Sequence, residues 1–231
     1  MLRFFILILF CLIPFVFGAR AQQRPANNEP KKMETPLPSK KANSRPAPAA
    51  KSKSVPAEPF EKASVEKMAA QCVKLETEAG IIEIALLPET APESVRNFLN
   101  LAAMGAFDTT TFSRVVPGFV VQGGNISTRE KITPELEQRS RRTIPDEPNS
   151  VKHERGVVSM ARSSEPNSAT SHFFILVGDA RHLDGTFAAF GRVTSGMEVV
   201  DNINKMPVEG DKPTSPVKLK RVVVAACPEQ N

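Results

Sequence analysis

The chain has 231 residues, a formal net charge of +5 and 41% hydrophobic residues, which is enough for one substantial domain with additional segments. The positive charge lies in the N-terminal part, because residues 69–231 carry 18 Lys and Arg against 20 Asp and Glu, a net charge of −2. This part has no basic patch with interleaved aromatic residues, which argues against nucleic acid as a partner.

The chain begins with a pattern that is typical of a secretory signal peptide. A short basic start precedes the apolar run 4–17, and Ala19 and Ala21 place small residues at the −3 and −1 positions of a cleavage site. The run of about 14 residues is shorter than the roughly 20 that a membrane-spanning helix needs. We predict a signal peptide at 1–21 and a periplasmic or secreted protein, which stays membrane-anchored if the leader is not cleaved.

Residues 22–68 have the composition of a disordered linker. They contain eight prolines, ten Lys or Arg, five Glu and few large apolar residues. Such a segment cannot bury enough apolar area to offset its chain entropy, so we expect an extended tether. Two interpretations stay open: a solvated spacer, or a tether whose lysines make weak contact with anionic components of the cell envelope.

The remaining residues, 69–231, have the pattern of one mainly β domain. Helices are predicted to start at capping boxes in 90–93 and 195–198, and the polar stretch 126–153 is predicted to cross the surface without regular structure. Eight segments read as strands: 73–77, 81–87, 111–116, 119–122, 156–161, 172–177, 187–193 and 217–225. Because few strands alternate with helices, we expect a closed eight-stranded antiparallel β-barrel capped by two α-helices.

Two cysteines remain if the leader is removed. Cys72 precedes the first predicted strand and Cys227 follows the last, so antiparallel pairing of these strands would bring the two thiols together. An even pair in an exported protein suggests a disulfide. The sequence leaves both a Cys72–Cys227 disulfide and two free thiols open.

The stretch 112–124 reads Phe-Ser-Arg-Val-Val-Pro-Gly-Phe-Val-Val-Gln-Gly-Gly and places one charge, Arg114, inside an apolar run. A strand that buries a guanidinium must pair it or use it, because an unpaired buried charge costs several kcal/mol or more. We therefore look for function at Arg114, Phe119 and Gln122. The structural alternatives are an ion pair for Arg114 and ordinary core packing for Phe119.

Three ordered blocks give the chain a resemblance to the cyclophilins, a family of peptidyl-prolyl cis-trans isomerases. Besides 112–124, they are Ser-Met-Ala-Arg at 159–162 with Pro-Asn-Ser-Ala-Thr-Ser-His-Phe-Phe-Ile at 166–175, and Leu-Asp-Gly-Thr-Phe at 183–187 with Phe-Gly-Arg-Val at 190–193. The pattern is closer to bacterial members than to the cytosolic eukaryotic type. The resemblance implies the cyclophilin-like barrel and the isomerisation of X–Pro peptide bonds.

The resemblance also implies roles for individual residues. Arg114 matches the catalytic arginine, and Gln122 matches the side chain that bonds the substrate backbone. The apolar wall that receives the proline ring matches four residues: Phe119, Phe174, Leu183 and Phe187. The rim where the preceding residue lies matches Ala161, Ser163 and Ser164. Val120 and His172 depart from the residues that are common beside this pocket.

Isomerisation of this kind requires no nucleophile, metal or cofactor, and the three histidines lack metal-ligand spacing with each other or with the cysteines. We therefore expect a monomeric enzyme without a cofactor that acts on unfolded or folding exported polypeptides containing X–Pro bonds. An alternative stays open, in which a weakly catalytic module binds proline-containing segments or acts as an envelope scaffold.

Overall fold

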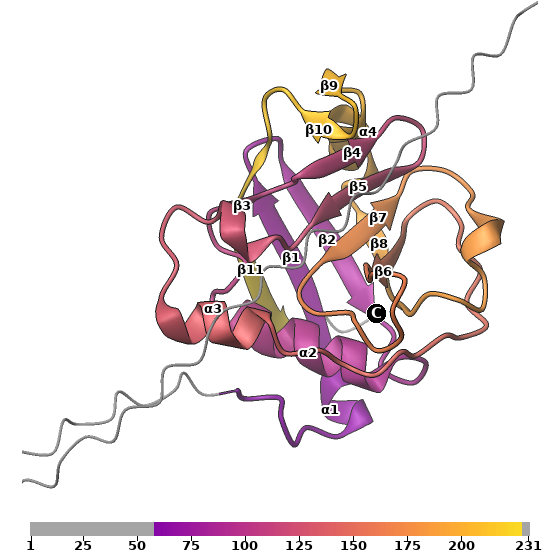
Figure 1. Ribbon diagram of the computed structural model, residues 1–231. Helices are drawn as coiled ribbons and strands as arrows, with labels where there is room; N and C mark the ends of the chain where they lie inside the picture. Colours follow the sequence, from indigo (N-terminus) through magenta and orange to yellow (C-terminus); the bar gives the residue numbers. More distant parts are fainter. Residues whose placement is uncertain (1–57, 228–231) are drawn as a thin grey trace, which may run out of the picture. The chain divides into compact units, whose positions relative to one another are not determined.

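The computed structural model describes residues 58–227, and one curled antiparallel sheet dominates this part of the chain (Figure 1). The expected signal peptide at 1–21 and the first part of the expected linker lie outside the described residues. The nine strands of the sheet among the described residues follow the order β3-β11-β1-β2-β8-β6-β7-β5-β4. Their bounds are β1 Gln71–Thr77, β2 Ile81–Leu86, β3 Thr110–Thr111, β4 Arg114–Val116, β5 Val120–Gly123, β6 Val157–Met160, β7 Phe173–Leu176, β8 Ala189–Ser195 and β11 Lys218–Ala226.

The chain itself joins the two edges of the sheet. The edge strands β3 and β4 are separated only by Phe112 and Ser113, whose backbone N–H groups donate to the carbonyl oxygens of Val217 and Gln122 at 3.0 and 3.1 Å. The mainly β fold is as predicted, but the strand count differs. The stretch 111–116 was expected to be one strand, whereas β3 pairs with β11 and β4 pairs with β5, so the two segments are separate strands.

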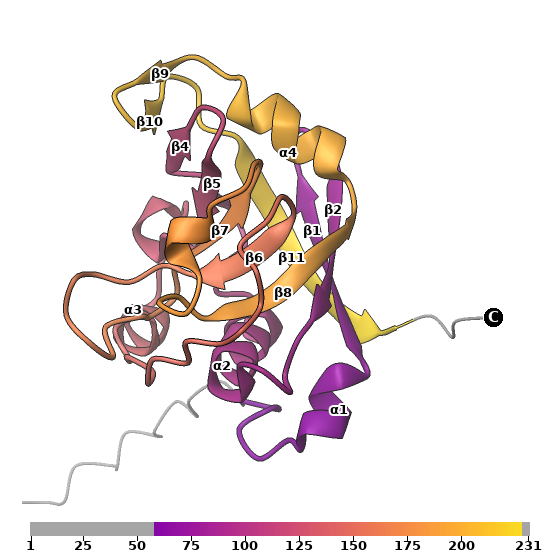
Figure 2. The same ribbon diagram turned by 90° about the vertical axis from the view of Figure 1, so that its right-hand side faces the viewer.

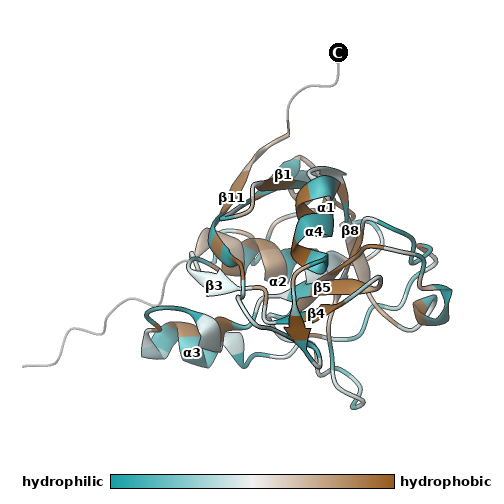
Figure 3. Cartoon of the chain, turned by 90° about the horizontal axis from the view of Figure 1, so that it is seen from above, coloured by the Kyte–Doolittle hydropathy of each residue, from teal (hydrophilic) through white to brown (hydrophobic). Residues whose placement is uncertain are grey.

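Two helices lie at opposite ends of the curled sheet, as expected (Figure 1). They are α2, Pro92–Ala103, and α4, Met197–Asn204. Seen from above in Figure 3, α4 carries both brown and teal bands, which fits a helix that buries one side against the strands. No helix within residues 58–227 combines the length and the apolar character that a bilayer span requires.

The starts of these helices differ from the prediction. The N-cap residues are Ala91 for α2 and Gly196 for α4, and neither makes a side-chain capping bond. For α2 the carboxylate of Glu147 accepts hydrogen bonds from the backbone N–H groups of Glu93 and Ser94 at 2.9 and 2.8 Å. The predicted capping boxes are therefore wrong, since a carboxylate distant in sequence satisfies the free N–H groups of α2 instead.

The stretch 126–153 is more regular than predicted. It contains a 3-10 turn, η1 Ile126–Thr128, and a third helix, α3 Pro134–Ser140. Thr133 accepts a hydrogen bond from the backbone N–H of Leu136 at 3.3 Å, and proline occupies the first helical position. A Thr-Pro pair at a helix start is a recognisable signal, and the burial of Leu136 then fixes the helix on the domain.

The sheet separates two hydrophobic clusters. Along β5, Val121 belongs to the larger cluster inside the curl, whereas Val120 belongs to a smaller cluster on the outer face. Ile175 and Phe174 of β7 are divided in the same way, because successive side chains point to opposite faces. Both faces of β6 and β7 are thus covered, which explains their uninterrupted apolar sequences. In Figure 3, β4 and β5 are largely brown and the loops around them largely teal.

The predicted linker ends earlier than Met68. Residues 58–63, here called the strap, lie against α2, and the short helix α1, Val65–Ala69, follows them. Phe60 is 8% exposed and Met68 is fully buried, so these residues belong to the folded domain. The composition of the linker concealed these two anchors among prolines and charges.

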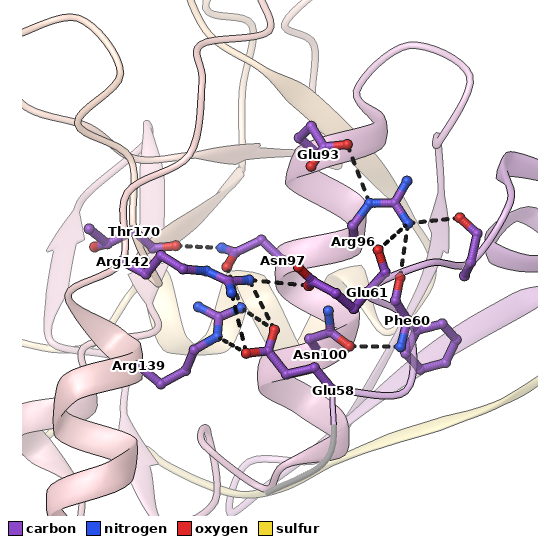
Figure 4. Close-up of polar contacts among 11 residues, drawn as sticks. Glu58, Phe60, Glu61, Glu93, Arg96, Asn97, Asn100, Arg139, Arg142 and Thr170 are labelled. Carbon is purple, nitrogen blue, oxygen red and sulfur yellow. Dashed lines mark hydrogen bonds and ion pairs between the residues drawn. The ribbon is translucent and has the colours of Figure 1, made fainter. Parts of the chain in front are cut away.

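Polar side chains of α2 hold the backbone of the strap (Figure 4). Arg96 Nη1 donates to the carbonyl oxygens of Phe60 and Ala63 at 2.9 and 2.7 Å, and Asn100 Oδ1 accepts the N–H of Phe60 at 2.8 Å. These bonds satisfy backbone groups that would otherwise lose water without a partner. They explain why a proline- and charge-rich segment becomes ordered at this point.

Cys72 and Cys227 form a disulfide, one of the two states that the sequence allowed. Their Cα atoms are 4.8 Å apart, and the bond closes a sequence separation of 155 residues. The antiparallel pairing of β1 with β11 places Cys72 opposite Ala225 and so brings the two ends of the domain together.

Candidate active site

A pocket of about 170 Å³ lies on the outer face of the sheet, over β4, β5 and β7. Nine residues line it: Arg114, Phe119, Val120, Gln122, Ala161, Arg162, Phe174, Leu183 and Phe187. Seven of them are site residues expected from the sequence. Two larger hollows, of about 550 and 470 Å³, lie beside the strap and beside β11. We give the smaller pocket priority because it combines aromatic walls with a few convergent polar groups, as ligand sites do.

Strand register aligns three of the lining residues. Arg114 of β4 lies directly opposite Gln122 of β5, and Gln122 lies directly opposite Phe174 of β7. Directly opposite residues of antiparallel strands have their side chains on the same face. The guanidinium, the amide and one aromatic ring therefore form a row across three strands.

The Arg114 side chain is half exposed and paired, so the expectation of a buried guanidinium is wrong. Its Nε donates to Asp211 Oδ2 at 2.9 Å, and Nη2 lies 2.9 Å from the same oxygen. The side chain is 41% exposed because β4 is an edge strand at the rim of the pocket. Solvent and Asp211 together stabilise the charge that the sequence seemed to leave inside a strand.

The turn between β4 and β5 carries Phe119 into the pocket. Gly118 has φ +73°, a conformation that side-chain-bearing residues rarely adopt. Asn204, at the end of α4, accepts the N–H of Gly118 at 2.8 Å and donates to the carbonyl oxygens of Val116 and Val120 at 2.9 and 3.1 Å. One amide thus fixes the turn from both of its sides.

Aromatic contacts build the wall of the pocket. The rings of Phe174 and Phe187 meet edge to face with centroids 5.9 Å apart and an interplanar angle of 77°. Phe119 packs against His182, and the centroids of the two rings are 5.6 Å apart. Figure 2 shows the orange segment with the 3-10 turn η2, Arg181–Leu183, beside β7. This segment supplies Leu183 and, after it, Phe187.

A buried histidine holds that segment to the sheet. Asp184 accepts the backbone N–H of His153 at 2.7 Å, which holds the pKa of the Asp184 carboxyl below its ordinary value. His153 Nδ1 lies 3.3 Å from the same carboxylate and Nε2 lies 3.0 Å from Ser159 Oγ. Burial lowers the pKa of His153. Ser159, His153 and Asp184 have the order of a nucleophile–base–acid series, but Ser159 and His153 are fully buried behind the wall and have no access to a substrate.

The expected rim is only partly brought to the pocket. Ala161 lines it, whereas Ser163 and Ser164 lie on the exposed loop beyond and are not among the lining residues. The hydroxyl of Ser163 bonds Ser168 Oγ at 2.9 Å, so it stabilises its own loop. Arg162 takes the place at the rim, and its guanidinium lies 5.1 Å from the centre of the Phe187 ring.

Sequence reasoning missed several residues that shape the site. Arg162 belongs to the second block but was given no role, and Val120 was named only as a departure beside the pocket. Asp211 and Asn204 carry no local signal, since they lie 97 and 86 residues along the chain from the groups they bind. His153 was considered only as a metal ligand; within residues 58–227 no group of three or more His, Cys, Asp or Glu side chains is placed to hold a metal ion.

Comparison with known proteins matches residues 72–224 to the family model described as cyclophilin type peptidyl-prolyl cis-trans isomerase/CLD. The chain is 41% identical over 158 residues to peptidyl-prolyl cis-trans isomerase A of Dickeya dadantii, a match that covers 66% of this chain and 80% of the relative. It is 37% identical over 172 residues to a peptidyl-prolyl cis-trans isomerase of Acinetobacter baylyi, covering 70% and 89%. A Cryptosporidium parvum cyclophilin-type isomerase, solved in the presence of the dipeptide Ala-Pro, aligns with a TM-score of 0.60 and 29% identity, over 68% of this chain and 99% of that chain.

The family match runs from the second residue of β1 into β11 and includes every residue that lines the pocket. Proline-containing peptides are the substrates of this family, and an apolar pocket beside a polar row suits a proline ring attached to a peptide backbone. The chain belongs to the cyclophilin-type peptidyl-prolyl cis-trans isomerases, which interconvert the cis and trans forms of X–Pro peptide bonds.

Proposed function

We propose that this cyclophilin isomerises X–Pro bonds in polypeptides that have left the cytoplasm, and that Arg114 stabilises the twisted prolyl amide. Family membership supplies the class of reaction. The observation that carries the mechanism is the position of the Arg114 guanidinium at the edge of an apolar pocket, opposite Gln122.

The reaction needs a group that interacts more strongly with the twisted amide than with the planar one. An X–Pro bond rotates over a barrier of about 18–20 kcal/mol, because the amide loses conjugation when it is perpendicular. In that state the proline nitrogen gains a lone pair, which an N–H of Arg114 can bond. A donor that acts mainly in the transition state lowers the barrier, and one such donor is typically worth about 3–4 kcal/mol.

The other lining residues have complementary roles in this mechanism. Phe119, Phe174, Leu183 and Phe187 hold the proline ring on the apolar wall. Gln122 bonds the peptide backbone, so that rotation occurs about the amide between two fixed ends. This mechanism transfers no proton and needs no bound cofactor.

The proposed location outside the cytoplasm rests on the leader pattern at 1–21, and the disulfide supports it. Disulfides persist in oxidising compartments and are rare where thiols are kept reduced. The Cys72–Cys227 bond joins the two ends of the domain, as a stabilising bond in such a compartment would.

An isomerisation assay with purified protein tests the mechanism. The kcat/KM of Arg114→Ala for an X–Pro peptide should fall about 100- to 1000-fold. Arg221→Ala is a matched control, because Arg221 also pairs with a carboxylate, Glu76, but on β11 and away from the pocket. Full activity of Arg114→Ala would rule out the proposed role. No activity in the wild-type protein would favour a binding module.

Expression of the full chain in a bacterium tests the location. We expect the protein in the periplasmic or secreted fraction, with an N-terminus at residue 22 and no free thiols before reduction. A full-length chain in the cytoplasmic fraction would contradict the proposal, and a full-length chain in the membrane fraction would indicate an anchored protein.

A further inference from the structure

The partner of Arg114 lies on a small hairpin outside the main sheet. Asp211 lies between β9, Val208–Glu209, and β10, Lys212–Pro213 (Figure 1). The hairpin is tied to the strand that carries Arg114, because the backbone N–H of Val115 donates to the carbonyl oxygen of Asp211 at 2.8 Å. This backbone bond therefore holds Asp211 at the position from which its carboxylate reaches the guanidinium.

The contact uses one edge of the guanidinium. Nε and Nη2 of Arg114 both approach Asp211 Oδ2 at 2.9 Å, whereas the described residues give Nη1 no hydrogen-bond partner. A planar guanidinium held by one edge presents its remaining N–H groups in a fixed direction. Arg114 lines the pocket while Asp211 does not, so the carboxylate orients the donor without occupying the substrate's place.

We propose that Asp211 is a positioning residue for the isomerase reaction, which orients the Arg114 guanidinium before the substrate binds. This rests on the proposed catalytic role of Arg114. A free arginine side chain has many rotamers, and a group that is ordered before binding loses less entropy when it acts. Both side chains of the pair are about half exposed, so its contribution to folding is small, and the main effect of the contact is on the geometry of Arg114.

A carboxylate beside Arg114 also has an effect that would lower the rate, since it offsets part of the charge that Arg114 presents to the twisted amide. The direction of the change in activity distinguishes the two. If orientation dominates, removal of the carboxylate lowers kcat. If charge compensation dominates, removal raises kcat.

The experiment measures kcat and KM for an X–Pro peptide with the full-length protein and three variants of one position: Asp211→Asn, Asp211→Ala and Asp211→Glu. We expect kcat to fall roughly tenfold in the first two variants, because misplacement of a catalytic group by about an ångström reduces rates by one to two orders of magnitude. KM should change less than twofold, and Asp211→Glu should recover part of the loss.

Glu76→Gln is the matched control. Glu76 of β1 accepts hydrogen bonds from Nε and Nη2 of Arg221 at 2.7 and 3.0 Å. The variant therefore loses the same charge and also an arginine–carboxylate ion pair, away from the pocket. Its kcat should equal that of wild type, and its unfolding midpoint should match that of Asp211→Asn. A kcat of Asp211→Ala equal to or above wild type would overturn the proposal.

A second background separates this inference from the proposed function. Arg114→Lys keeps the charge but lacks the planar guanidinium that Asp211 orients. In Arg114→Lys, the further change Asp211→Asn should alter kcat less than twofold, because coupled residues are not additive. A tenfold loss in that background would overturn the positioning role. Wild-type activity of Arg114→Lys and Arg114→Ala would instead overturn the catalytic role of Arg114.

Discussion

Two arginine–carboxylate pairs of this cyclophilin lie in contrasting surroundings. Arg114 and Asp211 at the pocket are 41% and 55% exposed, whereas Arg139 of α3 and Glu58 of the strap are 7% and 16% exposed. Arg139 donates to both oxygens of Glu58 and to Asn97 Oδ1 of α2, so three separate segments meet at one guanidinium (Figure 4).

The difference shows that burial decides what such a pair does. In water-exposed surroundings an ion pair adds little to stability, which leaves the Arg114 side chain available to a substrate. In buried surroundings the pair stabilises the fold only as long as both partners are present, because removal of one leaves an uncompensated charge. The charges are the same, but one pair lies at the pocket and the other holds the strap.

The largest expected effect comes from the buried pair. Arg139→Ala should lower the free energy of unfolding by about 3–4 kcal/mol, because Glu58 then keeps only the half-exposed Arg142 as a partner and Asn97 Oδ1 loses its donor. The matched control is Arg141→Ala, at the C-cap of the same helix. The Arg141 side chain is 76% exposed and pairs with Glu137, so the variant should change stability by less than about 0.5 kcal/mol. Urea unfolding of the variants measures both. Equal free energies of unfolding for Arg139→Ala and Arg141→Ala would contradict the claim that burial decides what such a pair contributes.

The pocket and the strap differ in how much of them could be predicted from the sequence. Arg114 and Gln122 were singled out by the local pattern of the stretch 112–124, and Phe174 was assigned from the family resemblance; strand register aligns the three. The strap was missed, because its order depends on hydrogen bonds with Arg96 and Asn100 of α2, about 40 residues away.

The pocket shows the same limit. Asp211 and Asn204 were missed for want of any local pattern, since only the folded chain brings their side chains to β4 and β5. Ser163 and Ser164 were assigned to the rim by similarity, but the loop turns them into solvent.

The next largest effect is expected from reduction of Cys72–Cys227, which joins β1 to the residue after β11. Closing a separation of 155 residues gives roughly 5 kcal/mol as an upper figure, and measured values are typically about 2–4 kcal/mol. Urea unfolding of the oxidised protein, compared with the reduced protein and with the Cys72→Ser/Cys227→Ser variant, measures this contribution. The isomerase activity of the folded fraction should be unchanged. A parallel loss of activity would mean that the structure of the pocket depends on the disulfide.

A smaller effect is expected where one amide holds the pocket turn. Asn204→Ala removes three hydrogen bonds to the backbone of 116–120, at a cost of about 1–3 kcal/mol for the buried groups left unpaired. Because the turn carries Phe119, the KM for an X–Pro peptide should rise as well. Asn149→Ala, which also removes a side-chain bond to a backbone carbonyl, should leave KM unchanged. A normal KM in Asn204→Ala would mean that Phe119 keeps its place without this bond.

The smallest effect is expected from pH. Burial lowers the pKa values of His153 and His172 below the ordinary value of about 6.5, so both are neutral in the folded state at neutral pH. As pH falls below about 6.5 the unfolded chain binds protons that the folded protein does not, and stability decreases by at most about 1.4 kcal/mol per pH unit for each histidine. The decrease ends at the lower folded pKa. Unfolding between pH 7.5 and 5.5 should show this decrease, and a smaller one in His172→Gln. A flat profile in the wild-type protein would contradict it.

The most direct measurement compares Arg114→Ala and Arg139→Ala for both kcat/KM and free energy of unfolding in the same preparations. We expect opposite outcomes for the two variants. Arg114→Ala should lose about 100- to 1000-fold in kcat/KM while changing stability by less than about 1 kcal/mol. Arg139→Ala should lose about 3–4 kcal/mol of stability while its folded fraction keeps wild-type activity. Loss of both properties together in Arg114→Ala, or full activity of that variant, would contradict the catalytic role of Arg114.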